Sequence, residues 1–156
     1  MGVFQFFDPQ IKIKDCSPGW VFLGNIQPSL QLNVIAKLKS YNHIVTDTMN
    51  LWIDSEYDKL TKVLAITDIL LLNDEEALQY TGALNIEQAA LALRNAGPSV
   101  VIIKLGAKGA YLSHEKQSSF VPAFPVDRVV DPTGAGDSFA GGFVSYLAQS
   151  DGLDYF

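Results

Sequence analysis

The sequence predicts an α/β protein in which helices cover both faces of a mostly parallel sheet. Short, fully apolar runs at residues 69–72 and 100–103 alternate with stretches of helical periodicity. Strands that are buried on both faces have this continuous apolar pattern, and their alternation with helices is typical of parallel sheets. No polar linker divides the chain, so we expect a three-layer α/β/α sandwich in one domain over residues 1–156.

The first part of the chain repeats a strand followed by a helix. Residues 3–15 alternate loosely between apolar and polar and are expected to form a hairpin or an extended segment. The next expected strands are residues 20–24, 44–47 and 69–72. Each is followed by a helical pattern, and these patterns begin at Pro28, Ser55 and Asp74. The second helix should run to Ile66, and the third should end at Gly82.

The second part adds one more such unit and then changes character. Asn85 is expected to cap a helix that Gly97 ends, and residues 100–104 form the next strand. The turn at 106–109 leads directly into a strand at 110–113, and a further strand at 120–123 should pair with it in antiparallel fashion. A last helix follows residues 134–136, with apolar side chains at helical spacing: Phe139, Phe143, Tyr146 and Leu147.

Composition excludes several classes of protein. Seventeen acidic and eleven basic residues give a net charge of −6, the opposite of the basic surface that a nucleic-acid binder needs. No apolar run is long enough to span a membrane, and the N-terminus lacks the pattern of a signal peptide. Cys16 is the one cysteine, which excludes an intramolecular disulfide and a four-cysteine zinc site. We therefore expect a cytoplasmic protein with neither nucleic acid nor a membrane as partner.

Residues 131–143, DPTGAGDSFAGGF, carry the clearest chemical signal. Gly134, Ala135 and Gly136 leave the backbone uncovered where a helix begins, so amide groups and the positive end of the helix dipole point outward. Such a helix start binds anions, phosphate above all. Asp137 adds a carboxylate that can accept a proton from an attacking hydroxyl while the amides stabilise a phosphoryl group.

Other interpretations of this segment are open. The glycines could form an ordinary flexible loop, with Asp137 as a helix cap. The spacing does not fit a dinucleotide-binding GxGxxG pattern, and no Gly-Lys-Ser/Thr follows as in a Walker loop.

The full string resembles the C-terminal signature of the PfkB family of carbohydrate and nucleoside kinases, which have the ribokinase-like fold. Two further segments agree in order and spacing. Residues 73–76, NDEE, resemble the family's Asn-x-x-Glu element, and residues 104–109, KLGAKG, resemble a strand and turn that line the ATP site. The resemblance covers the chain from about Trp20 to its end.

This resemblance implies an ATP-dependent kinase that acts on a hydroxyl of a sugar or nucleoside. Asp137 would be the catalytic base, and Gly134, Ala135 and Gly136 would supply the amides of the anion hole. Asn73 would contact phosphate or water bound to Mg²⁺, and Glu76 would hold that water shell. The nucleotide would be bordered by Lys104, Gly106, Ala107, Lys108 and Gly109. Asp131 and Thr133 match positions that bind a monovalent cation such as K⁺ in some members.

Simpler structural roles remain open for these residues. Asn73 and Glu76 could simply cap a helix and have no role in binding, and Lys104 could be a solvated strand end. Asp47, Asn50 and Trp52 resemble a family stretch near the cleft, but they could equally form a turn and a core position, so they are not assigned to the site.

The chain is short for this family, whose members carry a sugar-binding segment and a β lid in the N-terminal half. Neither is recognisable here, so we expect a partial kinase domain with an incomplete sugar pocket. Strands without their neighbours would expose a sheet edge, which favours self-association. The alternatives are a non-catalytic nucleotide-binding fragment and a vitamin kinase of the same fold.

Overall fold

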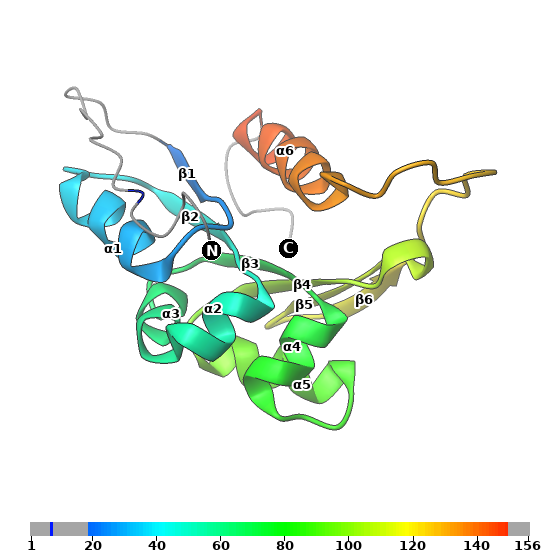
Figure 1. The fold of residues 1–156 in the computed structure, drawn as a ribbon, viewed down its shortest axis with the longest axis horizontal. Helices are drawn as coiled ribbons and strands as arrows, with labels where there is room; N and C mark the ends of the chain where they lie inside the picture. Colours follow the sequence, from blue (N-terminus) through cyan, green and yellow to red (C-terminus); the bar gives the residue numbers. More distant parts are fainter. Residues whose placement is uncertain (1–6, 8–18, 150–156) are drawn as a thin grey trace.

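The structure is a computed structural model that describes residue 7 and residues 19–149. Within these residues one six-stranded sheet has its strands in the order of the sequence (Figure 1). The strands are β1 (Trp20–Leu23), β2 (His43–Asp47), β3 (Ile69–Asn73), β4 (Val100–Lys104), β5 (Ala110–His114) and β6 (Ser118–Val121). Strands β1 to β4 pair in parallel, and β5 and β6 continue the sheet in antiparallel fashion. The predicted mostly parallel α/β class is confirmed.

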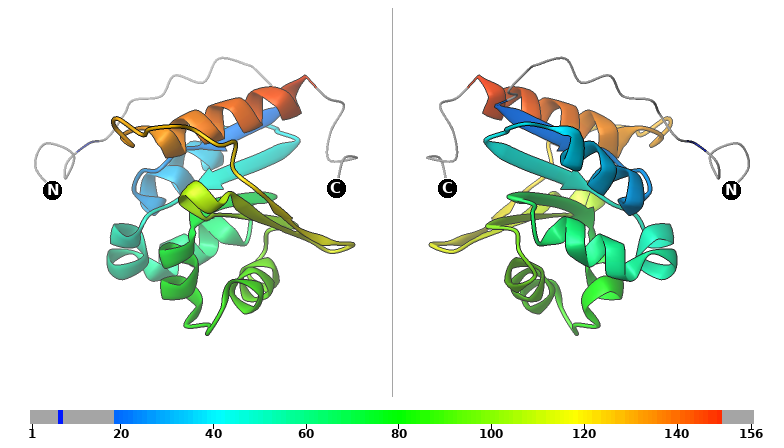
Figure 2. Two further views of the ribbon diagram at one scale, coloured as in Figure 1. Left: turned by 90° about the vertical axis from the view of Figure 1, so that its right-hand side faces the viewer. Right: turned by 90° about the vertical axis from the view of Figure 1, so that its left-hand side faces the viewer.

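Helices lie on both faces of this sheet. Their bounds are α1 (Pro28–Lys37), α2 (Asn50–Ser55), α3 (Tyr57–Leu64), α4 (Asp74–Thr81), α5 (Ile86–Asn95) and α6 (Ala135–Ala148). Figure 2 shows α6 on one side of the sheet and the other helices on the opposite side. The predicted three layers are therefore present, and among the described residues α6 forms the third layer by itself.

The central strands are buried on both faces. In β3, Leu70 and Leu72 pack with the helices of the larger layer, whereas Ile69 and Leu71 pack with Leu147 of α6. Successive residues of a strand point to opposite faces, so burying both faces requires an unbroken apolar run. This is the pattern that predicted the strand.

The helix expected over residues 55–66 is present as α3 but is shorter at both ends, and the separate helix α2 before it was not expected. Helix α2 ends at Ser55 and α3 starts at Tyr57, because Glu56 leaves the helical conformation with φ −136° and ψ 38°. Its carboxylate accepts a hydrogen bond from the backbone N–H of Ser29 at 3.1 Å, in the first turn of α1. The break thus places a carboxylate at the positive end of another helix, a contact between segments that periodicity cannot reveal.

Helix α6 also differs in the face that it buries. Ala140 and Leu147 are buried and Phe143 is partly buried, but Phe139 and Tyr146 are 37% and 62% exposed. The helix therefore approaches the sheet along positions 140, 143, 144 and 147.

The predicted segment at 3–15, Phe7 excepted, and Cys16 lie outside the described residues. Across residues 19–149, no helix is long and apolar enough to span a membrane.

Candidate active site

A cleft opens where the carboxyl ends of the parallel strands meet the start of α6. Asp47, Asn73 and Lys104 are the last residues of β2, β3 and β4. Open α/β sheets bind ligands at this edge. The cleft has a volume of about 1200 Å³ and is lined by Asn73, Asp74, Glu75, Lys104, Gly106, Gly109, Ala110, Val121, Pro122, Ala123, Phe124, Pro132, Ala135, Gly136 and Phe139.

The glycine-rich turn forms the N-terminus of α6, as expected. Gly134 is the N-cap, with a left-handed φ of 77° that favours glycine, and its carbonyl accepts the first helical hydrogen bond from Ser138 at 2.9 Å. The Ala135 amide donates to the Pro132 carbonyl at 3.1 Å. The amides of Gly136 and Asp137 precede the first helical hydrogen bond, so α6 itself offers them no carbonyl partner. These two amides, rather than that of Ala135, are the donors available to an anion.

Lys104 places a positive charge beside this helix start. A Cβ built on Gly136 would lie 3.6 Å from Lys104 Nζ, so the ammonium lies next to the backbone of the turn. The same Nζ forms an ion pair with Asp47 Oδ1 at 3.3 Å. Lys104 is therefore drawn into the site by a residue on β2, and it is not a solvated strand end.

Asp47 is a site residue that the sequence analysis left unassigned. It is 5% exposed, and Oδ1 also accepts a hydrogen bond from the Thr48 amide at 3.0 Å. Burial raises the pKa of Asp47, and the attraction of Lys104 offsets this only in part, while the charge of Asp137 adds a small further increase. Asp47, Lys104 and Asp137 therefore lie within electrostatic reach of one another.

Asn73 and Glu76 form a reciprocal capping box at the start of α4. The Glu76 amide donates to Asn73 Oδ1, and the Asn73 amide donates to Glu76 Oε2, both at 2.8 Å. Glu76 is 5% exposed, and burial raises its pKa, against the smaller lowering effects of the Asn73 hydrogen bond and of Lys104. The structure thus contains the capping role that the sequence left open, at a position on the edge of the cleft.

These side chains fit a divalent cation that keeps most of its water. Asp47 pairs with Lys104, the charges of both act on Glu76, and the charge of Asp137 acts on Asp47, so the three carboxylates outnumber the ammonium of Lys104. Yet the described residues contain no group of three His, Cys, Asp or Glu side chains placed to ligate one ion. Mg²⁺ typically binds through one or two carboxylates, substrate phosphates and several waters, which this arrangement permits.

The turn after β4 and the end of β6 form the opposite wall. Gly109 has a φ of 116°, and a Cβ there would collide with the Val121 carbonyl and lie 2.7 Å from the Ala123 nitrogen. Glycine is therefore required for the backbone after β6 to lie against this turn. Gly106 and Gly109 line the cleft as expected, whereas Ala107 and Lys108 are exposed and are not among its lining residues. Apolar residues after β6, including Phe124, were not predicted from the sequence.

Asp131 and Thr133 lie on the exposed loop before α6. The Thr133 amide donates to Asp131 Oδ1 at 2.8 Å, and the hydrogen bonds from Thr133 lower the pKa of this carboxyl. This contact orders the loop that leads to Gly134. The monovalent-cation site implied by these two residues stays a prediction.

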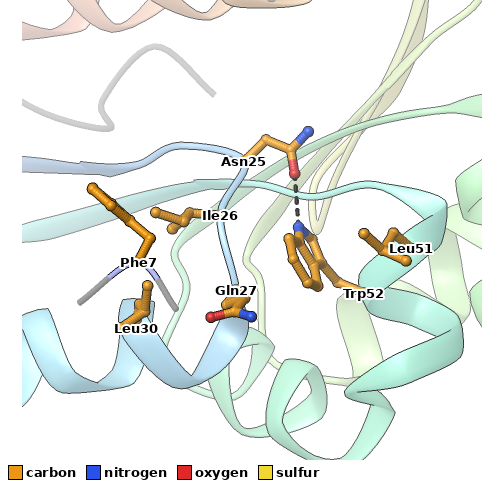
Figure 3. Close-up of a pocket in the computed structure, with 7 residues that line it drawn as sticks. All are labelled: Phe7, Asn25, Ile26, Gln27, Leu30, Leu51 and Trp52. Atoms are coloured by element: carbon orange, nitrogen blue, oxygen red, sulfur yellow. Dashed lines mark hydrogen bonds between the residues drawn. The ribbon is translucent and has the colours of Figure 1, made fainter. Parts of the chain in front are cut away.

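A smaller cavity of about 320 Å³ lies at the same edge of the sheet, between the loop after β1 and helix α2. Figure 3 shows its lining residues: Phe7, Asn25, Ile26, Gln27, Leu30, Leu51 and Trp52. The Trp52 indole N–H donates to Asn25 Oδ1 at 2.9 Å. Trp52 thus lines a cavity near the strand ends. From the sequence, its segment could have been either part of a cleft or a turn followed by a core position.

By fold, the chain is a ribokinase-like α/β protein. It superposes on aminoimidazole riboside kinase from Salmonella enterica, solved with aminoimidazole riboside and an ATP analogue, with a TM-score of 0.74 and 27% identity over 88% of this chain and 50% of that one. Fructokinase from Vibrio cholerae, solved with fructose, ADP and calcium ion, gives a TM-score of 0.74 and 26% identity over 90% and 49% of the two chains.

The chain belongs to the pfkB family of carbohydrate kinases, whose model matches residues 22–155. A cytidine kinase from Thermococcus kodakarensis is 36% identical over 138 residues, which are 85% of this chain and 49% of that protein. A ribokinase from Haemophilus influenzae is 35% identical over 98 residues, 60% and 32% of the two chains. The chain thus spans half or less of the length of these relatives.

The two asparagine caps allow a direct test of the structural role of Asn73. Asn73 caps α4 and Asn85 caps α5, each accepting from the amide three residues on. Loss of such a cap costs about 1 kcal/mol. Asn73→Ala and Asn85→Ala are therefore each expected to lower the free energy of unfolding by about that amount in urea unfolding. A variant with unchanged stability would contradict the cap at that position.

The buried Asp47 carboxylate gives the stability a predictable pH dependence. Its pKa is above the ordinary value of 3.8, so the folded chain binds the proton more tightly than the unfolded chain does. The ionised group therefore destabilises the fold at neutral pH. Asp47→Asn is expected to raise the free energy of unfolding at neutral pH, and the gain should fade as the pH drops through the raised pKa toward 3.8. Urea unfolding of both proteins over this range measures the difference, and a loss of stability at neutral pH would contradict it.

Proposed function

We propose that this chain carries the phosphate-binding half of an ATP-dependent kinase, which transfers a phosphoryl group to a hydroxyl of a sugar or a sugar-like substrate. One observation carries the proposal. At the carboxyl ends of the strands, beside a large cleft, the start of α6 has two amides without a helical partner, the Lys104 ammonium lies next to them, and Asp137 belongs to the same first turn. Phosphoryl transfer needs this combination of positioning and charge stabilisation more than covalent chemistry.

In the proposed reaction, Asp137 accepts the proton of the acceptor hydroxyl. The acceptor oxygen forms a bond to the γ-phosphorus as the bond from that phosphorus to the β,γ-bridging oxygen breaks, which leaves ADP. The amides of Gly136 and Asp137 and the ammonium of Lys104 stabilise the negative charge of the phosphoryl group. Asn73 and Glu76 would hold the hydrated Mg²⁺, which supplies neutralisation of phosphate charge when bound.

The remaining parts of the cleft suit the nucleotide. Gly106 and Gly109 bring backbone close to the bound molecule, while Val121, Phe124 and Phe139 offer apolar surface. Aromatic and aliphatic walls with a few polar groups are typical of nucleotide and small-molecule sites. A monovalent cation at Asp131 and Thr133 belongs to the same proposal.

Two alternatives differ in the reaction. The chain could bind nucleotide without catalysing transfer, because it spans half or less of the relatives' length. It could also act on a nucleoside or a vitamin alcohol. The first relative is a cytidine kinase, and the small cavity beside Trp52 offers an indole ring and apolar side chains, so nucleosides belong in every acceptor panel. The cytoplasmic location remains an expectation.

We also propose that the chain self-associates through the edge of the sheet at β1. Within the described residues β1 pairs with β2 alone, and Phe22 is 39% exposed. An open strand edge with apolar side chains favours pairing with another chain. Sedimentation equilibrium is expected to show an apparent mass that rises with concentration. A monomer over the whole concentration range would contradict this proposal.

The catalytic role of Asp137 is tested by Asp137→Asn. The variant is expected to lose about 100-fold to 10,000-fold in phosphoryl transfer, the range of general-base catalysis, because an amide cannot accept the proton. Its affinity for a non-hydrolysable ATP analogue with Mg²⁺ should stay within about threefold of the parent. ADP formation with a panel of sugars, nucleosides and pyridoxal measures the first quantity, and calorimetry measures the second.

Asp127→Asn is the matched control, since Asp127 is exposed in the loop between β6 and α6 and does not line the cleft. It makes the same change in net charge and should leave both quantities unchanged. Near-normal transfer by Asp137→Asn would overturn the assignment of the base. Nucleotide binding by the parent without transfer to any acceptor would favour the non-catalytic alternative.

A further inference from the structure

Lys104 owes its position in the site to a residue two strands away. It ends β4, whereas its ion-pair partner Asp47 ends β2, and β3 lies between them in the sheet. Neighbouring strands are about 4.8 Å apart, so the lysine side chain must extend across the end of β3 to reach the carboxylate. A free lysine side chain samples many rotamers, at an entropy of about 2 kcal/mol. The pair with Asp47 selects one of them.

Asp47 is itself held firmly. Its side chain is buried, and its carboxylate accepts from the Thr48 amide as well as from Lys104. Its backbone carbonyl accepts from the buried Gln31 side chain at 3.3 Å, and the same Gln31 nitrogen donates to the Gly24 carbonyl at 2.9 Å. The Asp47 carboxylate is therefore held in one position, and it can hold the flexible Lys104 side chain in turn.

The selected rotamer places the ammonium beside the helix N-terminus at which a phosphoryl group would bind. Lys104 Nζ is at van der Waals distance from the position of a Cβ on Gly136, the residue whose amide is available at the start of α6. Lys104 and Gly136 both line the large cleft. Because Gly136 has no side chain, nothing from that residue separates the ammonium from a ligand on the helix N-terminus.

Stability alone does not account for this pair. Burial outweighs the attraction of Lys104 in setting the pKa of Asp47, so the ionised carboxylate is less favourable in the folded chain than in water. Polar groups held at a cost to stability are typical of functional sites.

We propose that Asp47 is a positioning residue that acts through Lys104, holding its ammonium beside Gly136 so that it contacts the terminal phosphate of the nucleotide. This inference rests on the proposed function, because it presupposes that a nucleoside triphosphate occupies the cleft. Asp47 itself touches neither nucleotide nor acceptor in this scheme.

The test is a double-mutant cycle on the 156-residue chain, read by calorimetry with Mg²⁺ and either ADP or the β,γ-imido analogue of ATP. The ratio of the two affinities reports contact with the terminal phosphate. Lys104→Met is expected to reduce the preference for the triphosphate about tenfold, the effect of losing one charge-assisted contact. Asp47→Asn is expected to cause a similar loss, and the double variant no more than Lys104→Met alone.

Asp54→Asn is the matched control. Asp54 is exposed on α2 and accepts a hydrogen bond from Gln79 at 2.7 Å, so the same chemical change occurs at a hydrogen-bonded carboxylate outside the cleft. It should leave the triphosphate preference unchanged. Thermal unfolding of every variant shows whether it is folded, and Asp47→Ser takes the place of Asp47→Asn should that variant not fold.

Each of the following results would overturn the inference. An unchanged triphosphate preference in the folded Asp47 variant, or a loss that adds in full to that of Lys104→Met, removes the positioning role and leaves the proposed function standing. A lower melting temperature with an unchanged preference would give Asp47 a structural role alone. Failure of the parent chain to bind either nucleotide would overturn the proposed function, and the positioning role with it.

Discussion

The packing of α6 on one face of the sheet is the contact on which the site depends. Ala140 and Leu147 bury one face of α6 against the side of the sheet that carries Ile69, Leu71 and Ile102. This contact fixes the helix axis, and the axis determines that the free amides of its first turn lie above the strand ends. The small side chain of Ala140 leaves room for close approach near that end of the helix. A core contact thereby sets the position of the amides that we propose bind an anion.

Opposing charges concentrate around that position. Asp47 and Glu76 are buried carboxylates with raised pKa values, and burial is the main cause in both. The positive charge of Lys104 lowers the pKa of both carboxylates in part, and the negative charge of Asp137 on α6 raises that of Asp47 slightly. In the proposed function, a divalent cation would balance this excess of negative charge. The capping box around Asn73 shows that a residue can stabilise a helix and still lie on the edge of this cleft.

The sequence predicted the elements well where one local pattern decided them. The strands at β3 and β4, the cap at Asn85 and the C-terminal Gly82 follow from apolar runs and capping chemistry that need no distant partner. It missed helix α2 and the break at Glu56, whose carboxylate accepts a hydrogen bond from the first turn of α1. It also predicted Phe139 and Tyr146 on the apolar stripe of α6, because hydrophobicity alone does not show which side of the helix meets the sheet.

By itself, the sequence determined the α/β class, the membership in the pfkB family and the segments that supply the site, since each has a local signature in residues 73–76, 104–109 and 131–143. Only the tertiary structure decided how these segments act together. It paired Lys104 with Asp47 across β3, used the Ala135 amide within its own turn, and left Ala107 and Lys108 outside the cleft. The reason is physical: a motif fixes which groups are available, whereas strand order and helix packing fix which of them lie within reach of one another.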